Sequence, residues 1–97
     1  MILKLHPDAE VDLNLARDQY AKIDPVLAER FVAMLDETFG RIQKFPHLYP
    51  FESATAQKIL MKRFPFIVLY EVYHETIMIL AIFNTNRDPK VLSDRLG

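Results

Sequence analysis

The sequence predicts an α+β domain: a short N-terminal strand, an antiparallel helical hairpin, a three-stranded antiparallel meander and a short C-terminal helix. Three observations support this fold class. Two stretches with apolar residues at helical spacing are joined by only two or three residues. Two runs rich in β-branched and aromatic residues are separated by a short polar break. A length of 97 residues with 51% hydrophobic composition fits one domain covering 1–97.

The N-terminal part predicts a strand and then a helix. Ile2–Leu5 is a strand candidate that is too short to be stable without partner strands. Pro7 opens the helix, because proline loses no hydrogen bond at the first helical position, and acidic residues in the first turn suit the helix dipole. His6 is a poorer N-cap than serine or aspartate. The helix is predicted over about 7–22, with an apolar stripe formed by Leu13, Ala16, Tyr20 and Ile23.

A second start pattern follows at once. Asp24 is a good N-cap and Pro25 again opens the first turn. Helical spacing extends to about Lys44, with the stripe Leu27, Phe31, Leu35 and Phe39. Because the connection is so short, the two helices must be antiparallel.

Two prolines, Pro46 and Pro50, then end the helical pattern. The aromatic residues of this loop are Phe45, Tyr49 and Phe51. They could form a binding platform, but we expect them to pin the irregular loop onto the helix ends, which is the commoner use.

Three strands and a final helix complete the chain. The strands are predicted at Gln57–Met61, Phe66–Tyr73 and Ile77–Phe83, with a tight turn at His74-Glu75 between the last two. A helix of about two turns is predicted at Pro89–Leu96, capped by Asp88 and opened by its proline.

Both faces of the predicted hairpin are mostly apolar. In the first strand, alternation places one set on one face, namely Phe66, Val68, Tyr70 and Val72, and the other set on the opposite face, namely Ile67, Leu69, Glu71 and Tyr73. In the second strand, the two sets are Ile77, Ile79, Ala81 and Phe83, and Met78, Leu80 and Ile82. The helical hairpin can cover one face, whereas the short tail covers the other incompletely. We therefore expect an apolar groove for a partner, unless the tail and a curled sheet suffice.

Composition excludes several classes of function. There is no cysteine, and three scattered histidines give no metal-ligand spacing, so we expect neither a metal site nor a cofactor. No segment is apolar enough to span a bilayer and no signal peptide is apparent, which favours the cytoplasm. A net charge of −1 argues against a general nucleic-acid binder. The charge is uneven, since residues 58–97 carry six Lys/Arg against four Asp/Glu.

Short motifs occur in a characteristic order along almost the whole chain. They are Pro7-Asp8-Ala9, Asp12-Leu13 and Tyr20; Phe31 and Leu35; Phe45-Pro46, Leu48 and Pro50; Arg63-Phe64-Pro65-Phe66, Tyr70 and Val72; and Arg87-Asp88-Pro89. In this order the sequence resembles the RelE/ParE toxin superfamily of type II toxin–antitoxin systems, in particular its ParE-like, plasmid-stabilisation branch. The resemblance implies a toxin that a cognate antitoxin holds inactive by laying a segment in the apolar groove. The candidate antitoxin-binding residues are Ile67, Leu69, Tyr73, Met78, Leu80 and Ile82.

The superfamily has two activities, ribosome-dependent mRNA cleavage and poisoning of DNA gyrase, and the resemblance implies different residues for each. Of the cations that RelE-type nucleases use, Lys58 and Arg87 remain, but Ile67 stands where those nucleases have an arginine. The tail has Leu92 in place of a tyrosine. Loss of one charge-stabilising group typically lowers a rate by about 10² to 10³. If the chain were a nuclease, Lys62 and Arg63 would have to substitute for the missing cations, so the candidate nuclease site is Lys58, Lys62, Arg63 and Arg87.

The resemblance and the missing nuclease residues together predict a ParE-like inhibitor of DNA gyrase rather than an enzyme. The candidate target-binding residues are Arg63, Arg87, Lys90 and Arg95. Two alternatives remain: a RelE-like mRNA endoribonuclease acting on the ribosome, and a non-toxic member kept for complex formation. Arg87 also has a structural alternative, because it could pair with an acidic neighbour.

Overall fold

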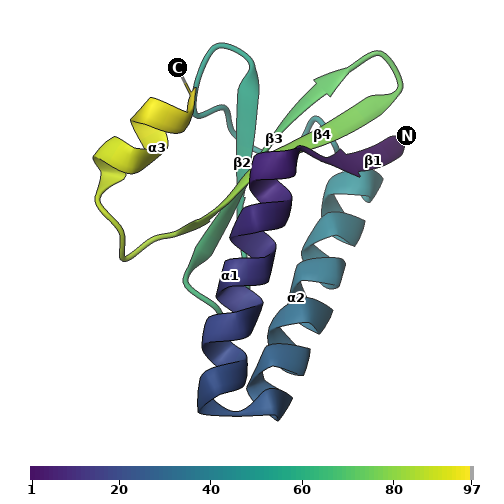
Figure 1. Cartoon of the computed structure of the whole chain (residues 1–97). Coiled ribbons are helices and arrows are strands. Elements are labelled where there is room, and N and C mark those ends of the chain that lie inside the picture. Colours follow the sequence, from purple (N-terminus) through teal and green to yellow (C-terminus); the bar gives the residue numbers. More distant parts are fainter. Residues whose placement is uncertain (97) are drawn as a thin grey trace.

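A computed structural model of the chain, which describes residues 1–96, has the predicted α+β architecture (Figure 1). The elements are β1 (Ile2–Leu5), α1 (Pro7–Ile23), α2 (Pro25–Lys44), β2 (Ala56–Leu60), β3 (Phe66–Tyr73), β4 (Thr76–Asn84) and α3 (Pro89–Leu96). The helices agree with their predicted ranges to within one residue, and β2 begins and ends one residue earlier than predicted.

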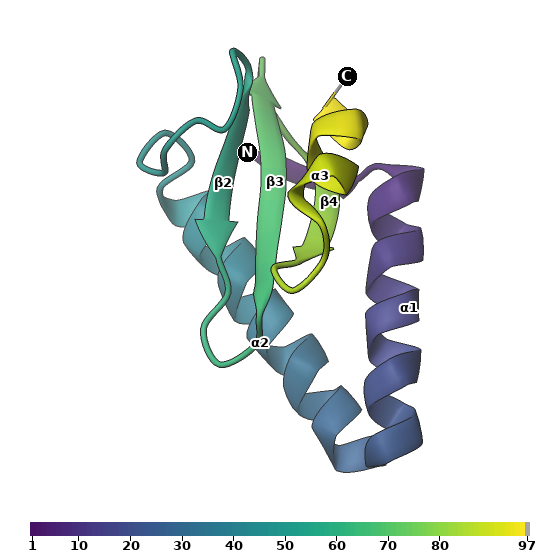
Figure 2. The same ribbon diagram turned by 90° about the vertical axis from the view of Figure 1, so that its left-hand side faces the viewer.

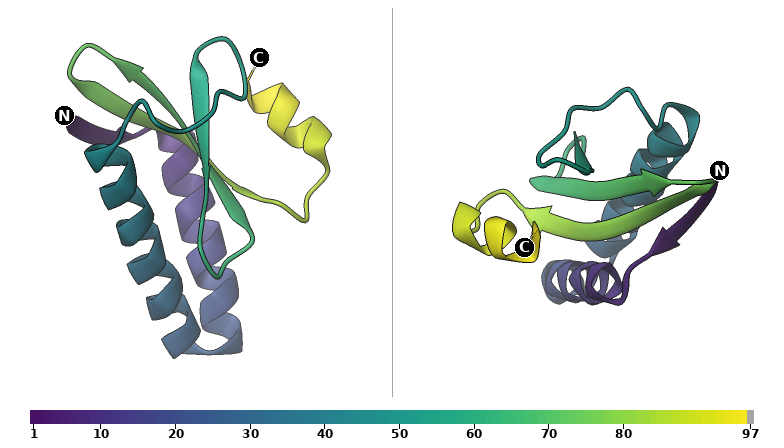
Figure 3. Two further views of the ribbon diagram at one scale, coloured as in Figure 1. Left: turned by 180° about the vertical axis from the view of Figure 1, so that it is seen from behind. Right: turned by 90° about the horizontal axis from the view of Figure 1, so that it is seen from above.

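The four strands form one sheet in the order β1-β4-β3-β2. β2, β3 and β4 form the predicted antiparallel meander, in which Val68 lies opposite Ile59 and Ile82. β1 runs parallel to β4 and lies near the β3–β4 turn (Figure 3). Its last residue, Leu5, lies opposite Ile79. The outer edge of β4 therefore has no neighbouring strand beyond Ile79.

Side-chain caps begin both long helices. Asp24 alone separates α1 from α2, so the two helices are antiparallel. Its Oδ1 accepts a hydrogen bond of 2.9 Å from the backbone N–H of Val26, which is the cap expected before Pro25. His6, expected to cap poorly, accepts a hydrogen bond of 3.1 Å through Nδ1 from the backbone N–H of Asp8.

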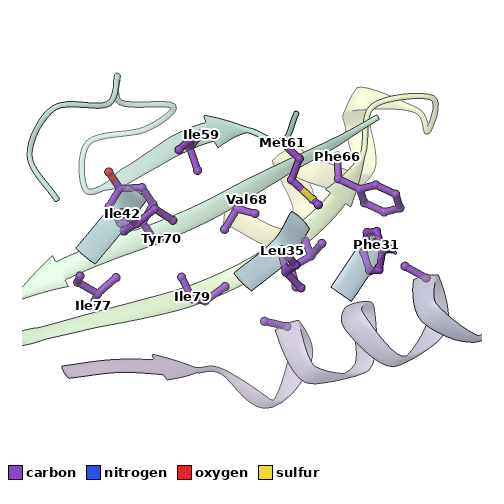
Figure 4. Close-up of a cluster of buried hydrophobic side chains, with 13 residues drawn as sticks. Phe31, Leu35, Ile42, Ile59, Met61, Phe66, Val68, Tyr70, Ile77 and Ile79 are labelled. Atoms are coloured by element: carbon purple, nitrogen blue, oxygen red, sulfur yellow. The ribbon is translucent and has the colours of Figure 1, made fainter. Parts of the chain in front are cut away.

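The main core fills the space between the sheet and the two long helices (Figure 4). Phe31 is fully buried at one end of it. The centroid of its ring lies 5.3 Å from that of Tyr20, 5.4 Å from that of Phe64 and 5.2 Å from that of Phe66. These separations are typical of favourable aromatic packing. The core continues through buried aliphatic side chains that include Leu35, Ile42, Val68, Ile77 and Ile79.

A β-bulge at Leu80 exchanges the two faces of β4. Consecutive residues of β3, Leu69 and Tyr70, lie opposite residues of β4 that are two positions apart, so Leu80 between them has no partner. The strict alternation predicted for β4 is therefore wrong beyond this point. Ile82 is buried in the main core, whereas Phe83 lies in the smaller cluster on the other face.

α3 lies on the face of the sheet opposite the long helices; in Figure 2 it lies in front of the strands, and α2 passes behind them. Leu92 is buried there against a cluster that includes Leu69 and Phe83. The cover is incomplete, as predicted from the length of the tail. Leu60 at the edge of the sheet is 62% exposed and Tyr73 is 49% exposed.

Hydrogen bonds, rather than aromatic side chains, hold most of the loop between α2 and β2. The Gln57 side-chain amide donates to the carbonyl oxygens of Pro46, at 3.0 Å, and Tyr49, at 2.9 Å. Tyr49 also packs against the main core, as predicted. Phe45 and Phe51, however, are 49% and 61% exposed, so the prediction that they pin the loop is wrong.

Candidate functional site

The four cations left for a nuclease site do not come together. Nζ of Lys58 lies 2.7 Å from the carboxylate of Glu52, on the α3 side of the sheet. Lys62 and Arg63 lie in the exposed β2–β3 loop, and Arg63 lines a hollow against α2. Arg87 lines a separate hollow beside α1. Lys58, Arg63 and Arg87 thus line three different hollows, and none of these hollows is lined by two of them.

The β2–β3 loop has an unusual backbone at Arg63. Its φ of 68° lies in the left-handed region, where a side chain is disfavoured. The next residue, Phe64, packs into the aromatic end of the main core. The loop therefore turns Phe64, which is partly buried, toward the core while Arg63 remains exposed. His74 has a φ of 53° and lies in the predicted β3–β4 turn.

Arg95, one of the predicted target-binding residues, is joined to α1. Its Nη1 donates to Asp12 Oδ1 at 3.2 Å and its Nη2 to Asp12 Oδ2 at 3.0 Å. Nη2 also donates to the carbonyl oxygen of Leu80 at 2.9 Å, and Asp12 Oδ2 accepts a hydrogen bond of 3.0 Å from the backbone N–H of Ile82. Arg95 therefore has a structural role. In the sequence, Asp12 stands out only as part of a motif, because no local pattern shows contact with a residue 83 positions away.

Arg87 and Lys90 are exposed where β4 leads into α3. Asp88 caps α3 as predicted, since its Oδ1 accepts a hydrogen bond of 3.0 Å from the backbone N–H of Lys90. No ion pair joins Arg87 or Lys90 to another residue in the range 1–96, so the alternative that Arg87 pairs with an acidic neighbour is not observed. These two cations are the most accessible members of the predicted target-binding set near the tail.

The six apolar residues predicted to contact an antitoxin fall into two groups. Leu69 is fully buried beneath α3, and Ile82 is buried in the main core, so neither is available on the surface. The placement of Ile82 on the open face was wrong because of the bulge at Leu80. The residues that remain partly exposed on the α3 face are Ile67, Tyr73, Met78 and Leu80.

An apolar groove of about 470 Å³ lies around the free edge of β2. We call it the β2-edge groove, and its lining includes Tyr49, Pro50, Leu60, Ile67, Arg41 and Lys58. Leu60, its most exposed apolar residue, was not among the predicted site residues. The signal that could have found Leu60 is strand alternation, which places its side chain on the same side of the sheet as that of Lys58.

Other kinds of site are not found in the part of the chain that the structure describes. Within 1–96, no group of three His, Asp or Glu side chains comes together that could hold a metal ion. No helix in this range is long and apolar enough to cross a membrane.

Comparison with known proteins agrees with the fold. The family model described as the ParE toxin of the type II toxin–antitoxin system, parDE, matches residues 3–89. The chain belongs to the ParE toxin family. Among solved structures, this ParE family member is similar to "Chromosomal ParDE TA system from P. aeruginosa", with a TM-score of 0.79 and 26% sequence identity over 89% of this chain and 97% of that chain. No curated protein matches the sequence significantly.

The limits of the ParE match bear on α3. The match ends at Pro89, the first residue of that helix. Asp12 lies inside the matched range, whereas its partner Arg95 lies beyond the end of that range. In this ParE family member the matched domain is therefore joined to the rest of α3 by a side-chain pair as well as by apolar packing.

Proposed function

We propose that this ParE family member is the toxin of a type II toxin–antitoxin pair, and that a cognate antitoxin encoded by the neighbouring gene holds it inactive. The family match over residues 3–89 supports this proposal, as does the solved relative, whose title describes a ParDE system. The antitoxin would cover apolar surface that the chain leaves exposed. The 62% exposure of Leu60 beside half-buried Ile67 makes the β2-edge groove the best candidate for that contact.

We also propose that the target of the toxin is DNA gyrase, so that the chain acts in the cytoplasm. The observation that carries this choice is that three of the candidate nuclease cations, Lys58, Arg63 and Arg87, line separate hollows. Metal-free RNA cleavage needs an acid or base and several cations around one phosphate. The exposed side chains of Arg87 and Lys90 favour a binding surface instead.

A supercoiling assay with purified gyrase and the folded 97-residue chain tests the proposal. We expect inhibition at micromolar toxin and an increase in cleaved DNA when the reaction is stopped with detergent. The absence of both effects would count against gyrase as the target.

Toeprinting on translating ribosomes tests the alternative activity. We expect no cleavage of the mRNA. Cleavage that disappears in Arg87→Ala would instead support an mRNA endoribonuclease. Strong expression without growth inhibition, in cells that lack the antitoxin, would favour a non-toxic member kept for complex formation.

A further inference from the structure

We infer that the β2-edge groove binds a chain segment that carries a bulky apolar side chain beside a carboxylate. The inference rests on the proposed function, because an antitoxin is the partner that would supply this segment. It adds the chemistry of the contact and a specific residue, Arg41, that recognises the carboxylate.

The groove has the size and lining of a site for an apolar group. Its volume of about 470 Å³ is within the range of about 300 to 1,000 Å³ found for ligand pockets. Leu60 is 62% exposed, and Ile67 is half-buried beside the same hollow. An exposed apolar hollow of this kind favours a partner that displaces water from it.

The charged residues that line the groove are both cations, Arg41 and Lys58. Lys58 is already paired with Glu52 at 2.7 Å. Arg41 is bound on one side only, where its Nε donates to Glu37 Oε2 at 3.2 Å. Nη2 of Arg41 is buried and has no hydrogen-bond acceptor among residues 1–96. A guanidinium group has five N–H donors, so Arg41 can donate to a further acceptor through Nη2 while it keeps its hydrogen bond to Glu37.

A carboxylate is the acceptor that best matches this unused capacity. A buried N–H group without an acceptor is unfavourable, and a guanidinium–carboxylate contact can form two parallel hydrogen bonds. The Arg41 side chain is 25% exposed, and its only ion pair among residues 1–96 is with Glu37, itself 42% exposed. Rotation of this long side chain can therefore turn Nη2 toward the groove that it already lines.

The apolar lining favours a peptide over a nucleic acid as the source of the anion. A phosphate could also accept from a guanidinium group, but it gains nothing from Leu60 and Ile67. A side chain such as leucine or phenylalanine fills the hollow, while a neighbouring Asp or Glu meets Arg41. Both features have to be present in one ligand.

Two small probes of the same shape test this inference on the full 97-residue chain by NMR titration. Phenylbutyrate combines an apolar ring with a carboxylate, and phenylbutyramide is its neutral counterpart. We expect phenylbutyrate to shift the methyl signals of Leu60 and Ile67 and the Nε–H signal of Arg41, with saturation at millimolar concentration. The amide should bind roughly tenfold more weakly, because it lacks the charge-assisted hydrogen bonds.

Variants test separately how the charged residue Arg41 and the apolar residue Leu60 contribute to binding of the probes. Arg41→Met should make the two probes bind equally, and Arg41→Lys should keep only part of the preference, because it keeps the charge without the planar fork. Leu60→Ser should weaken both probes. Lys44→Met removes an exposed cation near the end of α2 and should leave both affinities unchanged. If Arg41→Met does not fold, the test rests on Arg41→Lys, and an unchanged preference for phenylbutyrate in that variant would count against the role of Arg41.

Several outcomes would overturn the inference. They are equal binding of the two probes to the unmodified chain, no response at Arg41, saturation of the same signals by inorganic phosphate alone, and no binding of phenylbutyrate at millimolar concentration. The gyrase and growth assays use neither probe. A negative result in those assays would reject the proposed function, but binding of the probes could still be measured. A negative result with the probes would likewise leave the gyrase and growth assays able to test the proposed function.

Discussion

Arg95 and Asp12 form a two-hydrogen-bond ion pair that joins α3 to α1 across the uncovered edge of β4. No strand among residues 1–96 pairs with this part of β4, and the two side chains form hydrogen bonds with its backbone instead. Arg95 donates to the carbonyl oxygen of Leu80, and Asp12 accepts from the N–H of Ile82. Unpaired backbone groups on a sheet edge are open to association with other chains, so this pair protects the edge as well as holding the tail.

Replacing Arg95 should destabilise the fold measurably. In Arg95→Met, the Asp12 carboxylate loses its charged partner although its side chain is only 13% exposed. A part-buried charge left in this way costs about 1 to 3 kcal/mol of unfolding free energy. Urea unfolding should show this loss, and hydrogen exchange should show weaker protection of the Ile82 amide.

The exposed ion pair between Arg17 and Asp18 provides the control. Its Nε–Oδ1 distance is 3.7 Å, and its side chains are 46% and 66% exposed. Arg17→Met should therefore change stability by less than about 0.5 kcal/mol. If Arg95→Met costs no more than this control, the pair with Asp12 does not stabilise α3.

Tyr70 should make stability depend on pH in the alkaline range. Burial, with a smaller contribution from Tyr49, raises the pKa of the Tyr70 hydroxyl from 10.0 to about 12. The neutral hydroxyl, which donates to the carbonyl oxygen of Pro46 at 2.9 Å, is thus favoured by folding. The contribution of the Tyr70 hydroxyl to the free energy of unfolding is present in full below pH 10 and is lost as the pH rises toward 12. The shift corresponds to at most about 3 kcal/mol of unfolding free energy.

Urea unfolding at a series of pH values tests this in Tyr70→Phe. The variant should lose about 1 kcal/mol at neutral pH with its hydrogen bond, and should then show a smaller decline above pH 10 than the unmodified chain. Tyr73→Phe, at a 49% exposed position, should keep the original decline. Identical alkaline profiles for all three proteins would contradict the prediction.

The parts of the fold that depend on local chemistry could be predicted from the sequence. Asp24 and Pro25 mark the boundary between the long helices within one residue, since a cap and a fixed φ act on adjacent backbone. Asp88 and Pro89 do the same for α3. The ParE resemblance, built from short motifs in order, is confirmed by the match over residues 3–89.

The parts that depend on distant contacts could not be predicted. The bulge at Leu80 arises from pairing with β3, and it moved Ile82 from the predicted surface into the core. The partner of Arg95 is 83 positions away, so the sequence predicted a target-binding cation where the structure has an ion pair. The β2-edge groove is lined by Arg41 from α2 and by Leu60 from β2. Periodicity within one element cannot show that residues of two elements lie around one hollow.

Phe31 should be among the most sensitive positions in the core. It is fully buried, and its ring packs against three other aromatic rings at the end of the helical hairpin. Phe31→Ala should cost about 3 to 5 kcal/mol, a large part of the about 5 to 15 kcal/mol typical of a folded domain. Thermal unfolding followed by circular dichroism measures the loss. Ile23→Ala, at a 75% exposed position, should have little effect, and equal losses would show that the hairpin tip is packed in solution.

Substitution of Arg87 should weaken inhibition of the target without changing the stability of the fold. Its side chain is exposed and forms no ion pair with residues 1–96, so Arg87→Gln should change the free energy of unfolding by less than about 0.5 kcal/mol. If Arg87 contacts the target, the same change should raise the toxin concentration needed for half-inhibition of gyrase roughly tenfold, which corresponds to about 1.4 kcal/mol of binding. Arg17→Gln, another exposed arginine, should leave inhibition unchanged. Equal inhibition by both variants and the unmodified chain would move the target contact away from the β4–α3 junction, and a parallel loss in both would indicate a general effect of charge.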